Sequence, residues 1–244
     1  MLADPARAKD FYESYFANKR QDAAIREAQW RIVERSLIGR RGLVLELGCG
    51  DGSVSVRLAS MGLRVVASDF AVAPLRAVRE SVRHEDLGLS LVNADAQQLP
   101  VPDASFDAVV CLEVLEHVPS PERVIDEVRR ILRPGGLALL SVPNLVSPAE
   151  MLHQLKHLVF YILKKEPLTH ISPFHYLRVR RLTRGFRQRE VHGLHFLTAF
   201  LPRADGSTWL GKGVNLLHDL DLVLGRMLPL LAFDYLVVAT KGES

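Results

Sequence analysis

Short apolar runs of strand length alternate with stretches of helical periodicity through the first 145 residues. The apolar runs predict five strands, at 43–47, 63–68, 89–92, 108–111 and 137–142. The stretches between them predict helices at 53–60, 72–83 and 121–132, the last beginning at Pro121, a tolerated first-turn position. Because strands and helices alternate, we expect right-handed crossovers and a parallel sheet with helices on both faces.

This alternation breaks down after Asn144. Residues 151–163 predict a helix that is apolar all round, and a basic stretch follows it. Two more strands are expected at 186–191 and 233–240, with a leucine-rich helical region between them. We find no internal repeat and no linker, so the sequence predicts a single domain over residues 1–244 with a helical, basic, substrate-side insertion at about 145–232.

The composition is that of a globular α/β domain, with 48% hydrophobic and 24% charged residues. This apolar content excludes disorder, and 16 glycines and 13 prolines exclude a collagen-like or low-complexity chain. Two cysteines cannot build a disulfide framework. The sequence contains neither a signal-peptide core at its start nor an apolar run of membrane-spanning length, so we expect a cytoplasmic protein.

The net charge of +3 hides an uneven distribution. Residues 151–189 contain nine lysines and arginines and one acid, Glu166. This segment could lie peripherally on an anionic membrane, cover an apolar substrate or contact a partner. The simpler interpretation is a buried helix followed by a solvated basic face, and Arg178 to Arg184 also fit an ordinary amphipathic helix.

A glycine-rich loop, Glu46-Leu-Gly48-Cys49-Gly50-Asp-Gly52, follows the first predicted strand. Glycines permit positive φ and a close approach of ligand to backbone, and the next helix offers unpaired N–H groups. Tight turns need glycine in any case, so the loop alone is weak support for a ligand site. Its G-x-G-x-G spacing behind an acid differs from the G-x-G-x-x-G of dinucleotide-binding folds.

Two acids follow the next two strands. Asp69 lies 19 residues beyond Gly50, where a carboxylate can accept hydrogen bonds from ribose hydroxyls, and Asp95 could accept from an adenine amino group. Each has a structural alternative, a helix cap for Asp69 and a loop acid for Asp95. Three such features at successive carboxyl ends of parallel strands, where α/β folds bind ligands, favour a nucleoside cofactor.

The segments ELGCGDG, NADAQQLP, FDAVVCLEVLEHV and LRPGGLALLSVPN, together with Asp69, resemble the class I S-adenosylmethionine-dependent methyltransferases. The resemblance covers about 40–145 and the strand at 233–240, and residues 113–118 are similar to the branch of ubiquinone-biosynthesis O-methyltransferases and natural-product methyltransferases. It implies a Rossmann-like, doubly wound α/β fold whose seven-stranded sheet is mostly parallel with an antiparallel last strand. It also implies methyl transfer from S-adenosylmethionine, leaving S-adenosylhomocysteine.

The same resemblance implies the cofactor-binding residues. The glycine loop would surround the methionine part, Asp69 would hold the ribose, and Leu112 would lie near the sulfonium. The full set is Glu46, Gly48, Cys49, Gly50, Asp69, Phe70, Asp95, Ala96 and Leu112. A loop that opens with an acid suits this cofactor, because S-adenosylmethionine carries an ammonium and a sulfonium rather than a pyrophosphate.

Methyl transfer from a sulfonium is an in-line displacement that needs an aligned, deprotonated acceptor. His117 is the expected base, with Glu113 assisting, although His117 could equally pack locally. Glu113, Glu116 and His117 would share one face if this turn were helical, and could then hold Mg²⁺. The ubiquinone O-methyltransferases carry a metal on this Glu-x-x-Glu-His pattern, but metal-free relatives share it. Mg²⁺ is therefore a candidate cofactor that we do not predict as a bound metal.

Negative observations narrow the acceptor. The chain lacks the Asn/Asp-Pro-Pro-aromatic motif of amine methyltransferases that act on nucleic-acid bases, and Cys111 has no neighbouring proline. We therefore expect O-methylation of a small-molecule or lipid-like substrate and do not expect a nucleic-acid partner. The alternatives are N- or C-methylation of a metabolite or nucleic acid, a noncatalytic protein that binds S-adenosylmethionine, and an NAD-dependent oxidoreductase.

Overall fold

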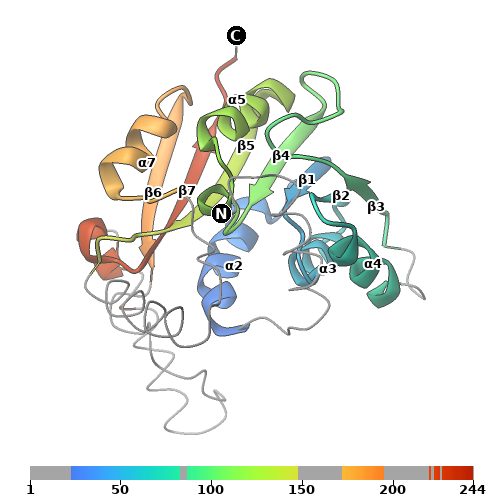
Figure 1. Cartoon of the computed structure of the whole chain (residues 1–244), viewed down its shortest axis with the longest axis horizontal. Coiled ribbons are helices and arrows are strands. Elements are labelled where there is room, and N and C mark those ends of the chain that lie inside the picture. The colour runs from blue at the N-terminus through green and yellow to red at the C-terminus, as the bar shows by residue number, and fades with distance from the viewer. Residues whose placement is uncertain are drawn as a thin grey trace, which may run out of the picture.

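The computed structural model describes residues 23–82, 87–147, 172–194, 220, 223–225 and 227–243. Its centre is a seven-stranded sheet in the order β3-β2-β1-β4-β5-β7-β6 (Figure 1). The strands are β1 (Leu43–Leu47), β2 (Arg64–Asp69), β3 (Leu89–Asn93), β4 (Phe106–Cys111), β5 (Leu132–Pro143), β6 (Gln188–Leu194) and β7 (Asp234–Thr240).

The sheet is mostly parallel. Strands β1 to β5 pair in parallel, whereas β7 runs antiparallel to both of its neighbours, β5 and β6. The predicted α/β fold with seven strands and an antiparallel last strand is confirmed. Because the carboxyl ends of β1, β2, β3 and β4 meet at one edge of the sheet, the loops that follow these strands are brought together.

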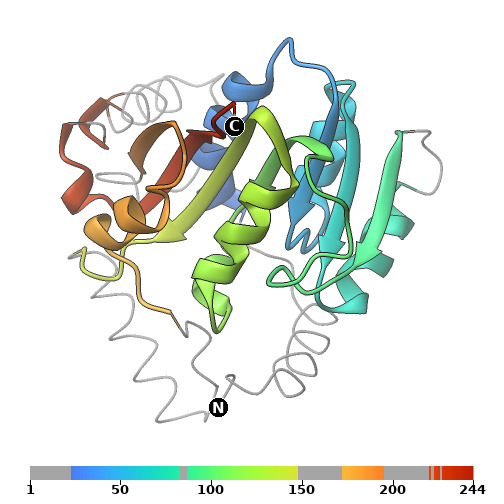
Figure 2. The same cartoon turned by 90° about the horizontal axis from the view of Figure 1, so that it is seen from above.

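Helices cover both faces of the sheet (Figure 2). They are α2 (Ala23–Leu37), α3 (Ser53–Ser60), α4 (Val72–Ser81), α5 (Pro121–Ile131) and α7 (Tyr176–Leu182), with 3₁₀ turns η1 (Leu115–His117) and η2 (Pro229–Leu231). In β4, Val109 and Cys111 pack on the side of α5, and Ala108 and Val110 pack on the side of α2 and α3. A strand covered on both faces is apolar at nearly every position, which explains why it is a continuous apolar run.

Two predicted strands have different bounds in the structure. β5 begins at Leu132 rather than at 137, because Pro134, Gly135 and Gly136 belong to an irregular first part whose register against β4 shifts between Phe106 and Ala108. β6 was expected at 186–191 but spans Gln188–Leu194. Phe186 precedes it and is buried in the core, so its apolar character reflects packing and not pairing.

The predicted helix at 151–163 lies outside the described residues, as does most of the predicted insertion at 145–232. The described parts of that region are α7, β6, η2 and a few residues between them. Within the residues that the structure does describe, no helix is both long enough and apolar enough to span a bilayer.

The glycine loop supplies a test of the packing between α3 and α4. Gly52 has φ of +76°, and a Cβ there would lie 2.5 Å from Val78 Cγ2 in α4. Gly62 has φ of +80° but nothing within 4 Å. We expect Gly62→Ala to cost only the backbone penalty of about 1–2 kcal/mol in free energy of unfolding, and Gly52→Ala to cost about 1–3 kcal/mol more, as measured by urea denaturation.

The double variant Gly52→Ala with Val78→Ala separates the steric clash from the backbone penalty. Removing the Val78 methyl groups should make the combined cost smaller than the sum of the two single costs. Strictly additive costs, or equal costs for the two glycine substitutions, would contradict this account of the packing.

Candidate functional site

The glycine loop after β1 is tied to the end of β2. The N–H groups of Gly48 and Cys49 both donate to the carbonyl of Ser68, at 2.8 and 3.0 Å. The N–H of Gly50 donates to Asp69 Oδ2 at 3.2 Å. Gly48 and Gly50 have φ of +72° and +51°, a backbone conformation that glycine adopts without a side-chain penalty. The loop therefore has one defined shape, set by the neighbouring strand.

Asp69 is nearly buried and joins two segments. Besides accepting from Gly50, its Oδ1 accepts from the N–H of Ala71 at 3.0 Å, just before α4 begins. This is a local turn contact before the helix and not a helix cap, since α4 has no side-chain cap hydrogen bond. Asp69 also lies against the glycine loop. A carboxylate has about four lone-pair positions, so two backbone contacts do not by themselves preclude contact with a ribose.

Two buried acids, Glu46 and Asp69, lie next to the glycine loop. Glu46 is 4% exposed and accepts a short hydrogen bond from Ser55 Oγ in α3. Burial, followed by the charges of Glu46 and Asp69, raises the pKa of the Cys49 thiol far above its usual range. Cys49 therefore stays a neutral thiol and is no nucleophile at neutral pH. Burial has the same effect on the pKa of Cys111 in β4.

The turn after β3 is held by its own side chains. Asp95 Oδ1 accepts from the N–H of Gln97 at 2.9 Å, and Gln97 Nε2 lies 3.2 Å from the same oxygen. Asn93 Nδ2 donates to the carbonyls of Asp69 and Phe70, at 2.8 and 2.9 Å. Asn93 thus links the ends of β2 and β3, and an adenine amino group would have to share the Asp95 carboxylate with Gln97.

The remaining predicted cofactor residues lie on opposite sides of the sheet. Ala96 is partly buried against the core cluster that includes α5, and Leu112 against the cluster that includes α2 and α3. Their packing neither requires nor excludes a cofactor contact, so their cofactor-binding role stays a prediction.

Glu113 follows β4 in a left-handed conformation, with φ of +55°. Its Oε1 accepts from Ser141 Oγ at 2.6 Å and from Gln29 Nε2 at 2.9 Å. The N–H of Glu113 in turn donates to Ser141 Oγ at 3.0 Å. Because β4 and β5 pair with Cys111 opposite Leu140, Ser141 lies directly beside this turn. Three hydrogen bonds therefore fix both the backbone and the carboxylate of Glu113.

A second acid, Glu116, is 1% exposed, and neither of its carboxylate oxygens has a hydrogen-bond partner among the described residues. Burial, then the charge of Glu113, raises the pKa of Glu116 well above its usual range. Burial, then the charge of buried Asp234, raises the pKa of Glu113 to about 7. His117 Nε2 lies 3.7 Å from Glu116 Oε1. Burial and like charge therefore disfavour the ionised form of both glutamates.

The shared helical face expected for Glu113, Glu116 and His117 does not form. Glu113 lies outside the helix because of its left-handed backbone, and η1 is a single 3₁₀ turn that begins at Leu115. The buried oxygens of Glu116 would suit a hard cation, but Glu113 Oε1 already accepts two hydrogen bonds. Among the described residues, no three His, Cys, Asp or Glu side chains converge closely enough to hold a metal ion. Mg²⁺ can also be held by one or two carboxylates together with water, so Mg²⁺ stays a candidate cofactor that we do not predict.

The glycine loop and the acidic turn touch each other. A Cβ on Gly48 would lie 2.3 Å from Val114 Cγ2, so only glycine permits this approach. Ser172, where the described chain resumes, donates its N–H to the carbonyl of Glu116 at 3.0 Å and its Oγ to the carbonyl of Val118 at 3.1 Å. The acidic turn is thus held between the glycine loop and the returning chain.

Residues 45–140 match a family model described as a methyltransferase domain. This span contains every candidate cofactor-binding and catalytic residue named above. Residues 45–140 thus resemble a methyltransferase domain. The resemblance to S-adenosylmethionine-dependent methyltransferases that the motifs indicate is confirmed for this part of the chain.

Curated relatives also match less than half of the chain. A ubiquinone biosynthesis O-methyltransferase from Dechloromonas aromatica is 40% identical over 113 residues, which are 45% of this chain and 47% of that protein. A protein of the same name from Pseudomonas aeruginosa is 35% identical over 116 residues, 47% of this chain and 49% of the relative. The chain thus spans about half the length of the curated relatives it matches.

Solved structures share the fold over most of the chain. An S-adenosylmethionine-dependent methyltransferase from Archaeoglobus fulgidus superposes with a TM-score of 0.62 at 20% identity, covering 95% of this chain and 99% of that one. Phosphoethanolamine N-methyltransferase 2 from Haemonchus contortus, bound to S-adenosylmethionine, gives a TM-score of 0.63 at 16% identity, covering 100% of this chain and 60% of that one. At these identities the likeness concerns the fold alone.

Three residues of the site were not found from the sequence. Ser141 and Asp234 flank the acidic turn from β5 and β7, which pair only in the folded sheet. Gln29 left a weak signal, because it lies on the same helical stripe as Val33 and Leu37, where a polar residue needs a buried partner. Its partner, Glu113, is 84 residues away in the sequence.

The buried carboxyl of Glu116 predicts a pH-dependent loss of stability. The pKa of Glu116 is higher in the folded than in the unfolded chain. Its contribution to the free energy of unfolding therefore becomes unfavourable as pH rises above the unfolded pKa of about 4.3. Glu116→Gln removes the ionisation. We expect the difference in Tm, variant minus wild type, to be larger at pH 8 than at pH 5, as measured by differential scanning calorimetry in EDTA.

Glu80→Gln, in the exposed face of α4, is the matched control and should show no such pH trend. An equal Tm difference for Glu116→Gln at both pH values would contradict the buried-acid interpretation. A rise in the Tm of the wild type with Mg²⁺ that is absent in Glu116→Gln would show that Glu116 holds a metal ion.

Proposed function

We propose that this chain transfers the methyl group of S-adenosylmethionine to a hydroxyl oxygen of a small or lipid-like molecule. The observation that carries the proposal is the position of Glu113. Its neighbour Val114 contacts Gly48 in the glycine loop, and the pKa of its carboxyl is raised to about 7. A base with a pKa close to the working pH is what the deprotonation of a hydroxyl acceptor requires.

The cofactor assignment is supported by the charge of the site. Glu46 and Asp69 place carboxylates on the inner side of the glycine loop, where a phosphate would be repelled and a cationic ligand favoured. S-adenosylmethionine carries an ammonium and a sulfonium and fits this environment better than NAD. The solved relative from Haemonchus contortus holds S-adenosylmethionine in a chain of the same fold.

The proposed reaction is a single displacement. The acceptor oxygen forms a bond to the methyl carbon while the bond from that carbon to sulfur breaks, and the hydroxyl proton passes to the Glu113 carboxylate. Ser141 and Gln29 hold that carboxylate in place through Oε1. His117 was the base expected from the sequence; in this proposal it assists Glu113, and its imidazole lies beside Glu116. No metal takes part in this scheme.

The choice of oxygen as the accepting atom rests on the curated relatives, which are named for O-methylation in ubiquinone biosynthesis. We extend that chemistry to this chain as an aromatic hydroxyl acceptor with an apolar substituent. The basic segment 151–189 adds the proposal of peripheral contact with an anionic membrane, which would bring the enzyme to a lipid-like acceptor.

To test the activity, an extract of the source cells is incubated with the enzyme and with S-adenosylmethionine that carries a labelled methyl group. The products are then partitioned between an organic and an aqueous phase. We expect label in the organic phase. Asp69→Ala should weaken S-adenosylhomocysteine binding at least about tenfold, because one or more hydrogen bonds to a charged group are lost. Asp126→Asn, an exposed acid in α5, is the control and should bind normally.

Label confined to the aqueous phase would indicate that the acceptor is a polar metabolite and not a lipid-like molecule. Tight S-adenosylhomocysteine binding without label in either phase would favour a noncatalytic protein. Tighter binding of NADH than of S-adenosylhomocysteine would overturn the cofactor assignment.

The base assignment predicts a pH profile. In the wild type, kcat/KM should rise with pH through about 7, as Glu113 loses its proton. Glu113→Gln should abolish this rise and lower kcat about 10²- to 10⁴-fold. The hydrogen bond from Ser141 lowers the pKa of Glu113, so Ser141→Ala should move the profile to higher pH.

If the rise of kcat/KM with pH persisted in Glu113→Gln and disappeared in His117→Gln, the base would be His117 and not Glu113. The rates are to be measured with saturating cofactor, so that a change in cofactor binding is not mistaken for a change in proton transfer.

A further inference from the structure

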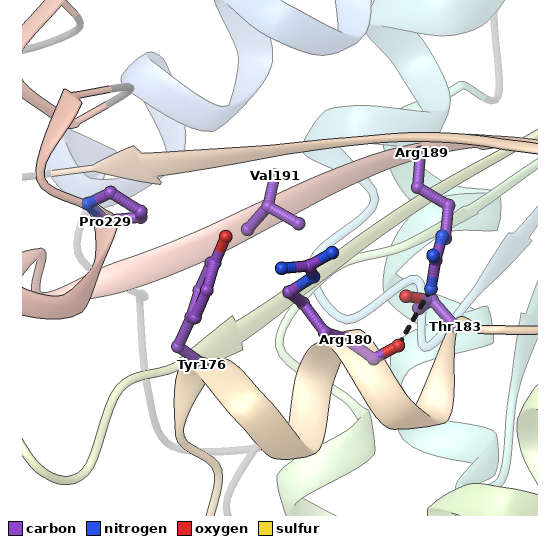
Figure 3. Close-up of a pocket in the computed structure, with 6 residues that line it drawn as sticks. All are labelled: Tyr176, Arg180, Thr183, Arg189, Val191 and Pro229. Carbon is purple, nitrogen blue, oxygen red and sulfur yellow. Dashed lines mark hydrogen bonds between the residues drawn. The ribbon is translucent and has the colours of Figure 1, made fainter.

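A small pocket lies between α7 and β6, at the edge of the sheet that is remote from the glycine loop (Figure 3). Its volume is ≈ 240 Å³, less than the roughly 300–1,000 Å³ that encloses a drug-sized ligand, so it suits one functional group of a ligand. The lining consists of two arginines, two residues with hydroxyl groups and two apolar residues: Tyr176, Arg180, Thr183, Arg189, Val191 and Pro229.

The two arginines face this pocket from different elements. Arg189 Nη1 donates to the carbonyl of Arg180 at 2.8 Å, which holds the Arg189 side chain alongside α7. The Arg180 guanidinium lies 5.8 Å from the centroid of the Tyr176 ring, and both side chains extend into the space between α7 and β6 (Figure 3). A guanidinium held in this way loses less conformational freedom when it binds a ligand.

None of the described residues that line the pocket is acidic. The neighbouring acid, Glu190, belongs to the opposite face of β6, since successive strand residues point in opposite directions. Its carboxylate lies 3.4 Å from His192 Nε2 on that face. Two like charges thus border the same small volume, and an anion between them would relieve their repulsion.

We propose that this pocket binds the phosphate group of an organic phosphate. Two guanidiniums match the roughly two negative charges of a phosphate monoester, whereas one would suffice for a carboxylate. The donors of each guanidinium form a planar fork that suits phosphate oxygens. The rings of Pro229 and Tyr176 and the Val191 side chain leave an apolar wall for the carbon atom that carries the phosphate. This site is independent of the proposed methyl transfer.

The first experiment is calorimetric titration of the full chain with phenyl phosphate at low ionic strength. We expect saturable binding of one molecule, tighter than binding of benzoate. Arg180→Gln and Arg189→Gln should each weaken binding at least about tenfold, the loss expected for a hydrogen bond to a charged group. Arg181→Gln, an exposed arginine of the same helix that does not line the pocket, is the matched control and should change binding less than about twofold.

Arg189→Lys is a second variant for the case in which Arg189→Gln does not fold. It keeps the charge but removes the fork, and should weaken phenyl phosphate binding while leaving that of benzoate nearly unchanged. S-adenosylhomocysteine binding should be unaffected in all four variants, so a failure here is distinct from a failure of the proposed function. Absence of saturable binding, equal affinity for benzoate, or an equal loss in Arg181→Gln would overturn the proposal.

Vesicles distinguish a soluble phosphate ester from a lipid headgroup. Phosphatidic acid exposes a phosphate monoester, whereas phosphatidylserine supplies negative charge without one. Preference for phosphatidic acid vesicles that is lost in Arg180→Gln but kept in Arg181→Gln supports the pocket with a lipid as its ligand. Equal binding to both vesicles, with phenyl phosphate binding intact, supports the pocket with a soluble ester as its ligand.

Discussion

The candidate site depends on one buried aspartate whose side chain and backbone carbonyl together connect three parts of the fold. Asp69, the last residue of β2, accepts from Gly50 in the loop after β1 and from Ala71 before α4, while Asn93 at the end of β3 donates to its carbonyl. These contacts set the shape of the glycine loop, and the loop in turn fixes how closely Val114 can approach. A substitution at Asp69 would therefore disturb the position of the acidic turn as well as the proposed cofactor contact.

The acidic turn is organised by electrostatics at low solvent exposure. Three carboxyls, Glu113, Glu116 and Asp234, lie close enough for the charge of one to raise the pKa of another. Hydrogen bonds from Ser141 and Gln29 favour the charged form of Glu113 and oppose this effect. The result is that burial and neighbouring charge raise the pKa of both glutamates, while these hydrogen bonds counteract the rise at Glu113. Neighbouring carboxyls whose environments differ in this way can take different roles.

The sequence predicted the seven strands and most helix bounds, because these follow from apolar periodicity and from glycine and proline positions, whereas the antiparallel β7 was implied by the resemblance to the methyltransferases. It also predicted that the glycine loop and Asp69 lie at the same edge of the sheet, since parallel strands bring their carboxyl ends together. It did not predict the partners of Glu113, because Gln29 and Ser141 meet it only through tertiary packing. The expected helical face failed for a local reason, the left-handed φ of Glu113, which no periodicity reports.

That left-handed residue links stability to chemistry in this fold. A side chain other than glycine in this conformation costs about 1–2 kcal/mol of backbone free energy, and here the side chain is a buried acid as well. A glycine at position 113 would relax the backbone and remove the unfavourable carboxyl together. If Glu113 is the base that we propose, the fold gives up folding free energy to keep a reactive group in place, and selection for thermal robustness alone would tend to erase the acid.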